Sequence, residues 1–189
     1  LNAFLGDPGS FDVERDYVSD VIYIGKTFGS FGNWKGKMHR ILTRGNADPG
    51  QWDVTTLLNP EKPVLTRPTV SLDGKMRPWV YFGTGRLFTA GPDSDTADKS
   101  AQALYGIKEG GVNGCWDTDG RKWKAFCSGP PTVTSLFDSS EPFIGEGGYV
   151  DGVTNETIFS LVDTDIESKD GWVLNLTNGE RILQNVAVL

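Results

Sequence analysis

Four acidic side chains between residues 12 and 20 are the strongest candidates for chemistry in this chain. Their carboxylates belong to Asp12, Glu14, Asp16 and Asp20, and the backbone carbonyl of Val18 completes a series of oxygens at alternate positions. In an extended segment, residues two apart point to the same face, so these oxygens would gather there. Like charges so close repel one another unless a cation lies among them. Because the oxygens follow the order of a calcium loop, residues 12–20 predict a Ca²⁺ site.

Neighbouring residues bear on the type of ion and on how the loop closes. Ca²⁺ tolerates loose oxygen geometry, whereas Mg²⁺ resists losing water, and zinc would call for a His or Cys nearby. Tyr17 replaces the glycine of an EF-hand turn, and Tyr23 stands where a bidentate Glu would close the site, so the loop would be a truncated one. The alternative is a solvated acidic loop whose charge Arg15 partly neutralises.

Two cysteines, Cys115 and Cys127, flank the turn Asp119-Gly120 within an inserted hairpin over residues 113–129. Antiparallel strands on either side of that turn would bring the two sulfurs opposite each other. The even count, the short spacing and the lack of a Cys-x-x-Cys motif predict a disulfide. A disulfide in turn indicates an exported protein. Two reduced, buried cysteines in a cytosolic protein remain the alternative.

Residues that usually carry catalysis are scarce. The single histidine, His39, alternates with its neighbours as an ordinary strand residue does, and no nucleophile elbow accompanies it. The glycine pair Gly83 and Gly85 is not followed by the Lys and Ser or Thr of a phosphate loop. A second acidic run, residues 163–167, lacks a donor at the ninth position of a calcium loop. We therefore expect no catalytic residues and a non-enzymatic protein.

Composition and charge narrow the range of partners. The 189-residue chain is long enough for one sizeable core and has a formal net charge of −7. Without a stripe of Lys and Arg it is not expected to bind nucleic acid, and an anionic membrane surface would repel it. No apolar run of about 18 residues is present, so no membrane-spanning segment is expected. Because residue 1 is not Met and the last residues resemble an interrupted strand, we expect a piece of a longer protein.

Short strand-like runs separated by turn signals must position these groups, and they predict an all-β fold. The expected strands cover residues 21–26, 36–43, 52–57, 64–72, 79–83, 103–108, 132–137, 156–162, 172–176 and 181–189, with two more in the Cys hairpin. Only residues 98–105 suggest a short helical turn. Such strands suit a sandwich, a barrel or a propeller. A pattern shared by residues 22–25 and 80–83 favours a partial β-propeller of antiparallel sheet, with about three blades in a single domain over residues 1–189.

Several of these segments resemble motifs of the PilY family, the tip adhesins and assembly factors of type IV pili that are called PilC in some bacteria. The acidic loop, the strand VIYIG after it and residues 36–41 are similar to the family's acidic loop and its G-x-x-x-R strand. The motifs P-x-V, V-Y-F-G-T-G-R, YGI-x-D, GW and GER match residues 66–70, 80–86, 104–109, 171–176 and 179–183, with Glu109 where Asp is usual. The motifs follow the family's order and span nearly the whole chain.

This resemblance implies a C-terminal β-propeller module of an exported protein at the bacterial cell surface, the pilus tip or the outer membrane. It implies type IV pilus assembly and surface attachment, with minor pilins, the pilus machinery and a host or abiotic surface as partners. The family carries a calcium loop at the place of residues 12–20, and calcium would modulate pilus extension against retraction. The Cys115–Cys127 insertion departs from the family's pattern.

Two alternatives belong to other function classes. A quinoprotein alcohol dehydrogenase is also a propeller, with blades that end in tryptophan-glycine strands, but it would need cofactor ligands. A secreted carbohydrate-binding propeller would stack sugars on exposed aromatic side chains. The chain has six Trp and ten Phe, of which we expect Trp34 to be the most exposed.

Overall fold

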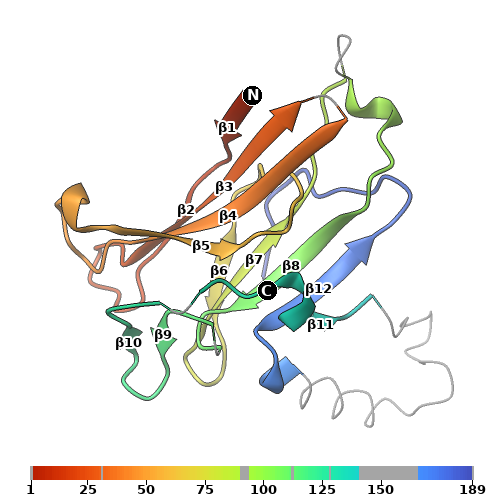
Figure 1. Cartoon of the computed structure of the whole chain (residues 1–189). Helices are drawn as coiled ribbons and strands as arrows, with labels where there is room; N and C mark the ends of the chain where they lie inside the picture. Colours follow the sequence, from red (N-terminus) through yellow and green to blue (C-terminus); the bar gives the residue numbers. More distant parts are fainter. Residues whose placement is uncertain are drawn as a thin grey trace, which may run out of the picture.

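Two five-stranded β-sheets packed against each other form most of the structure (Figure 1). The protein is represented by a computed structural model that describes residues 2–30, 32–89, 94–111, 113–127, 129–140 and 166–188. The first sheet contains β1 (Asn2–Leu5), β2 (Gly9–Phe11), β3 (Val21–Ser30), β4 (Asn33–Leu42) and β5 (Asp53–Leu58). Its order is β1-β3-β4-β5, with β2 also paired to β3, and every pair is antiparallel.

The second sheet is built from strands that lie far apart in the sequence. It contains β6 (Thr69–Leu72), β7 (Pro78–Gly83), β8 (Gln102–Lys108), β11 (Phe137–Asp138) and β12 (Gly171–Leu176). The order is β11-β12-β8-β7-β6, and only the short β11–β12 pair is parallel. A separate two-stranded hairpin consists of β9 (Trp116–Asp117) and β10 (Lys122–Trp123). The short 3₁₀ turns are η1 (Pro49–Gln51), η2 (Asp95–Ala97) and η3 (Val133–Ser135).

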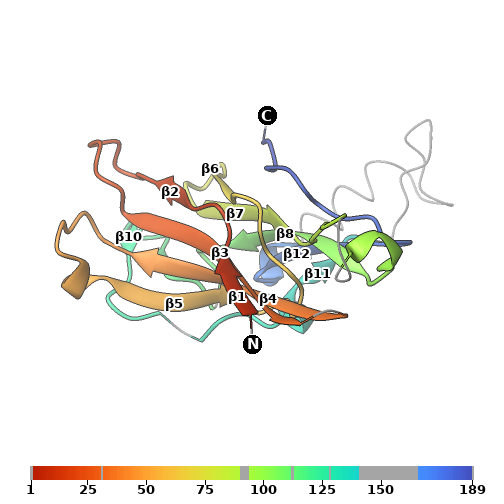
Figure 2. The same cartoon turned by 90° about the horizontal axis from the view of Figure 1, so that it is seen from above.

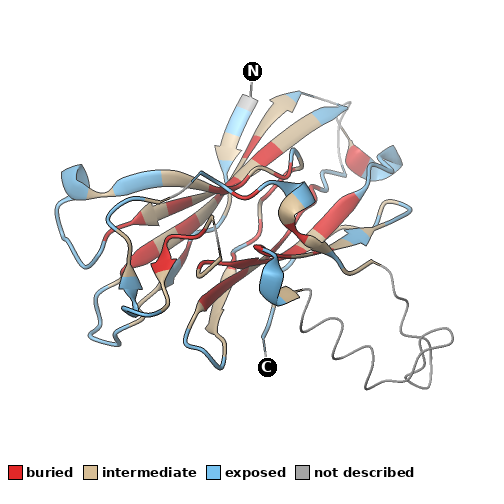
Figure 3. Ribbon diagram, turned by 60° about the horizontal axis from the view of Figure 1, so that its bottom comes forward, coloured by how far each residue is buried: buried red, intermediate tan, exposed pale blue. Residues whose placement is uncertain are grey.

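The core lies between the two sheets because one face of each sheet is apolar. Along β3 and β4 buried and half-buried residues alternate, as expected for strands that cover a core with one face. The first sheet contributes Val21 and Met38 to the core cluster, and the second contributes Phe82 and Tyr105, whose ring centroids are 5.2 Å apart. Figure 3 shows these buried segments along the strands of both sheets.

The two ends of the chain lie on opposite sides of the molecule, with β1 on one side and residues 181–188 on the other (Figure 2). Residues 181–188 form no strand. They are tied to the second sheet by single hydrogen bonds, from the Ile182 N–H to the Thr84 carbonyl at 3.0 Å and from the Thr69 hydroxyl to the Val186 carbonyl. No helix in the described part of the chain has the length and apolar character required to cross a bilayer.

The predicted all-β fold and the disulfide hairpin are confirmed. A closed barrel or propeller is not seen in the described ranges, which contain two large sheets and one hairpin. The strand expected at 156–162 lies outside the described residues, so the number of blades in the whole chain stays a prediction.

Four local expectations were wrong. The predicted strand 64–72 begins only at Thr69, because Pro68 has no N–H to donate to a ladder. The predicted strand 132–137 is mostly the turn η3, in which the Ser135 hydroxyl and N–H both bind the Thr132 carbonyl. The helical turn expected at 98–105 lies earlier, as η2, and residues 181–188 form no strand.

Candidate functional site

The acidic segment 12–20 forms the loop between β2 and β3, and its carboxylates bind the loop's own backbone. Asp12 accepts hydrogen bonds from the N–H of Arg15 at 2.6 Å and of Tyr17 at 2.8 Å. Asp16 accepts one from the Val18 N–H at 2.9 Å. Arg15 and Tyr17 have left-handed φ values of 60° and 72°, so the loop curls and is not extended.

Asp20 differs from the other acidic residues of this loop because it is buried, with 8% of its surface exposed. Its carboxylate accepts the N–H of Val13 at 2.8 Å. Burial raises the pKa of Asp20, the bond from Val13 opposes that rise, and the negative charges of Asp12 and Asp16 add to it. The charges of Asp12 and Asp16 therefore disfavour the ionised form of Asp20.

A preformed cation cage is nevertheless not found. No group of three or more His, Cys, Asp or Glu side chains able to hold a metal ion occurs among the residues that the structure describes. Oxygens of Asp12, Asp16 and Asp20 are already used by backbone N–H groups. The acidic members of the donor set Asp12, Glu14, Asp16, Val18 and Asp20 form no such group here, and calcium binding stays a prediction.

The predicted disulfide joins Cys115 to Cys127, whose Cα atoms are 4.8 Å apart, a usual separation for a disulfide. It closes the hairpin of β9 and β10, where the rings of Trp116 and Trp123 meet edge to face with centroids 5.2 Å apart. Arg44, which follows β4, donates to the carbonyls of Lys124 and Ala125 at 3.2 and 3.1 Å. The hairpin is thereby attached to the end of the first sheet.

A buried polar cluster joins the two sheets to this hairpin. The carboxylate of Glu109, just after β8, accepts the Tyr23 hydroxyl of β3 at 2.8 Å and the Arg40 Nη1 of β4 at 2.5 Å. It also accepts the Cys115 N–H at 3.1 Å. At most 1% of each of the side chains of Tyr23, Arg40 and Glu109 is exposed.

This cluster has a structural role, because its hydrogen bonds hold the two sheets and the hairpin together. We call it the Glu109 clamp. Burial and the charge of Glu109 raise the pKa of Tyr23 well above its usual value, so its hydroxyl stays protonated and donates. Arg40 uses its Nε to donate to the Thr55 hydroxyl of β5 at 3.1 Å. A buried ion pair persists only when such hydrogen bonds compensate lost hydration. Groups enclosed this fully do not reach a substrate in solution.

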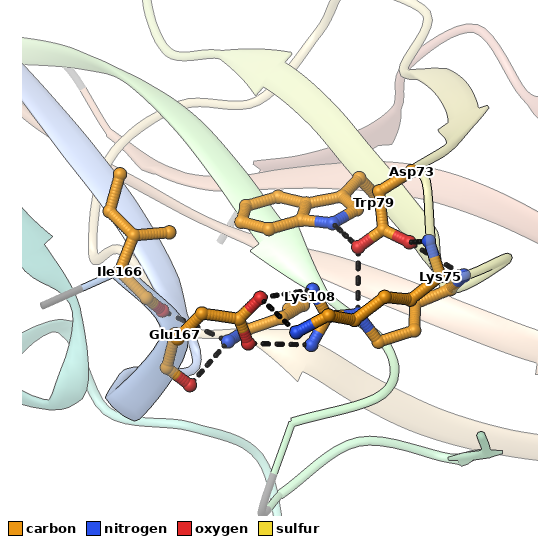
Figure 4. A network of polar contacts seen from close by, with 7 residues as sticks. Asp73, Lys75, Trp79, Lys108, Ile166 and Glu167 are labelled. Atoms are coloured by element: carbon orange, nitrogen blue, oxygen red, sulfur yellow. Dashed lines mark hydrogen bonds and ion pairs between the residues drawn. The ribbon is translucent and has the colours of Figure 1, made fainter. Parts of the chain in front are cut away.

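A second polar network lies at the surface of the second sheet (Figure 4). Arg77 binds Glu167 through two parallel hydrogen bonds of 2.8 Å and Asp73 through a third of 2.7 Å. Lys75 also binds Glu167, at 2.8 Å. The hydrogen bonds from Arg77 and Lys75 lower the pKa of Glu167 to about 2.

The same network holds the segment that leads into β12. Lys108 donates to the carbonyls of Ile166 and Glu167, both at 2.9 Å. The Trp79 indole N–H donates to Asp73 at 3.0 Å. Of the acidic run at 163–167, only Glu167 falls within the described residues, and its exposed carboxylate pairs with Arg77 and Lys75.

Segments that resemble family motifs contact one another although they are distant in the sequence. Gly106 of β8 pairs with Tyr81 on one side and with Trp172 on the other. A Cβ added to Gly106 would overlap the Trp172 ring, and one added to Gly83 would overlap Ile182. The glycines at both positions are therefore required by side chains of the later motifs.

Arg86 and Arg181, the arginines of the V-Y-F-G-T-G-R and GER segments, also meet. Arg181 donates to the Arg86 carbonyl at 2.6 Å. The Arg86 guanidinium lies between the rings of Trp34 and Phe88, 4.1 and 4.3 Å from their centroids, and binds Asp95 at 2.7 Å. Trp34 is only partly exposed, less than Phe88, so the expectation that it is the most exposed aromatic was wrong.

His39 lies on β4, next to an irregularity in its pairing with β5. It is half-buried, and burial and the charge of Lys26 lower its pKa. Sequence reasoning missed the Glu109 clamp and the Arg77 network. The clamp has no local signal, since its partners are 69 and 86 residues from Glu109.

Comparisons with protein-family models, with curated proteins and with solved structures found no match to this chain. The candidate function therefore depends on the geometry above and on the motif resemblance.

Proposed function

We propose that this chain is a non-catalytic β-sheet region of an exported PilY-type protein that supports type IV pilus assembly and surface attachment. Its partners are then minor pilins, the pilus machinery and a host or abiotic surface, at the bacterial cell surface, pilus tip or outer membrane. The observation that carries this proposal is the mutual packing of the motif segments, above all Trp172 against Gly106 and Ile182 against Gly83.

The packing matters because five short motifs could match a family by accident. Accidental matches have no reason to meet in space, whereas here the glycine of YGI accommodates the tryptophan of GW. Likewise the arginine of GER binds the carbonyl of the arginine in V-Y-F-G-T-G-R. The disulfide is compatible with an exported protein.

A propeller arrangement is part of the same proposal. In each sheet, four of the strands run antiparallel to their neighbours, in the orders β1-β3-β4-β5 and β6-β7-β8-β12. Four-stranded antiparallel sheets packed face to face are the blades of propellers. We assign the two sheets to neighbouring blades of a β-propeller that the described residues do not complete.

Calcium modulation is a separable part of the proposal. The loop 12–20 would have to exchange the backbone N–H groups on Asp12 and Asp16 for a cation. The repulsion that Asp20 experiences from Asp12 and Asp16 favours such an exchange. Calorimetric titration of Ca²⁺ into the chain and into the Asp16→Ala variant tests it. Absence of a binding heat in both would remove calcium and leave the pilus role standing.

The pilus role is tested in the bacterium that encodes this chain. Deleting the coding region should reduce the number of surface pili seen by electron microscopy, and a plasmid copy should restore them. Normal pili and normal surface attachment after deletion would contradict the proposal. A quinone-dependent alcohol oxidation assay on the purified chain addresses the enzyme alternative.

A further inference from the structure

The outer face of the second sheet carries a cavity of about 400 Å³, away from the core between the sheets. Its aromatic lining consists of Trp79 and Tyr81 from β7 and Trp172 from β12. Its polar lining includes Asp73, Lys75, Arg77 and Glu167. This volume lies in the range of pockets that hold small ligands, and aromatic side chains beside placed polar groups are typical of such pockets.

The aromatic lining is built by the sheet register. Tyr81 and Trp172 both pair with Gly106, so their side chains share one face, with a residue that has no side chain between them. Their ring centroids are 6.2 Å apart, and those of Tyr81 and Trp79 are 6.3 Å apart. Trp79 is buried beneath the network of Figure 4, whereas Tyr81 and Trp172 are partly exposed. The rings of Tyr81 and Trp172 line this cavity, which we call the trough.

The polar lining is balanced in charge. Asp73 and Glu167 are neutralised by Arg77, and Lys75 adds a second cation to Glu167. Lys75 is 62% exposed and Glu167 is 35% exposed, so both can still contact a ligand. An ammonium donates and a carboxylate accepts, which suits a ligand whose groups do both. Hydroxyl groups meet that requirement. A strongly charged ligand would be repelled by the lining groups that carry its own sign.

We propose that this trough binds a neutral carbohydrate. One sugar ring would place its apolar C–H face on Tyr81 and Trp172, and its hydroxyls would hydrogen-bond Lys75 and Glu167. This inference goes beyond the pilus role and does not depend on it, because it rests on contacts at β7, β8 and β12 and on the side chains of Lys75 and Glu167.

The test is a glycan array that carries neutral hexose and N-acetylhexosamine oligosaccharides, followed by calorimetry on the best binder. Tyr81→Ala should weaken binding by about tenfold, since one aromatic contact is lost. Lys75→Ala should weaken it several-fold and, as a change at an exposed position, should leave the fold intact. The matched control is Tyr17→Ala, because Tyr17 is fully exposed in the loop between β2 and β3. Its affinity should equal that of the wild type.

Three results would overturn the inference. The first is no neutral glycan bound above background. The second is binding that Tyr81→Ala and Lys75→Ala leave unchanged, or that Tyr17→Ala weakens equally. The third is concentration-dependent self-association, measured by light scattering, that Tyr81→Ala abolishes, because the trough would then be an interface between copies of the chain.

Discussion

Replacing Glu109 by glutamine removes the charge that holds the two sheets and the disulfide hairpin together. The substitution keeps the shape of the side chain but leaves the Arg40 guanidinium, 1% exposed, without its anion. Breaking a buried ion pair from one side costs about 3–5 kcal/mol. For a chain of this size each kcal/mol lowers the melting temperature by about 2–4 °C, so we expect a decrease of about 6–20 °C.

The assays are thermal unfolding and urea unfolding, both followed by tryptophan fluorescence, with Glu61→Gln as the matched control. Glu61 pairs with Lys35 at 2.9 Å, but the two side chains are 50% and 45% exposed. Exposed pairs contribute about 0–1 kcal/mol, so the control should unfold almost as the wild type does. The double variant Arg40→Met with Glu109→Gln should regain part of the lost stability, because it leaves no charge unpaired and keeps an oxygen that can accept from Tyr23 and Cys115. Equal losses for Glu109→Gln and Glu61→Gln would refute the clamp.

Three further predictions concern other contacts. Cys115→Ser with Cys127→Ser should lower the free energy of unfolding by about 2–4 kcal/mol in urea titrations, and an unchanged midpoint would show that the hairpin is not held by its disulfide. Glu167 has a pKa lowered from 4.5 to about 2, so its stabilising effect is present above pH 4.5 and is lost as pH falls toward about 2. Melting temperatures should fall over that range more for the wild type than for Glu167→Gln, and parallel curves would contradict the ion-pair network. Gly106→Ala should destabilise the chain by about 1–3 kcal/mol because its Cβ meets the Trp172 ring, whereas Gly74→Ala, with no atom within 4 Å of the added Cβ, should not.

The central strands could be read from the sequence because their residues alternate between core and surface. The predicted strand 79–83 matches β7 to within one residue, and 103–108 matches β8 equally well. The strand prediction failed at Pro68, which lacks a hydrogen-bond donor, and at residues 181–188, which contact Thr84 and Thr69 through hydrogen bonds without forming a strand. The apolar residues Val186–Val188 alone do not reveal that difference.

The candidate sites were less predictable than the strands. The alternate spacing of the acids at 12–20 predicts a shared face only if the segment is extended. The segment is not extended, because Arg15 and Tyr17 have left-handed φ values. The disulfide was predictable because both cysteines belong to one local hairpin. The partners of Glu109 come from β3 and β4, and only the packing of the two sheets brings them together.

The most direct test of the proposed role is a count of surface pili on cells that carry single glycine substitutions in this chain. Gly106→Trp would prevent Trp172 from packing on β8, and the account predicts pilus loss comparable to that of the deletion. Gly74→Ala, expressed to the same level, should give wild-type numbers. Full piliation of the Gly106→Trp and deletion strains would contradict the assignment of this β-sheet pair to pilus assembly.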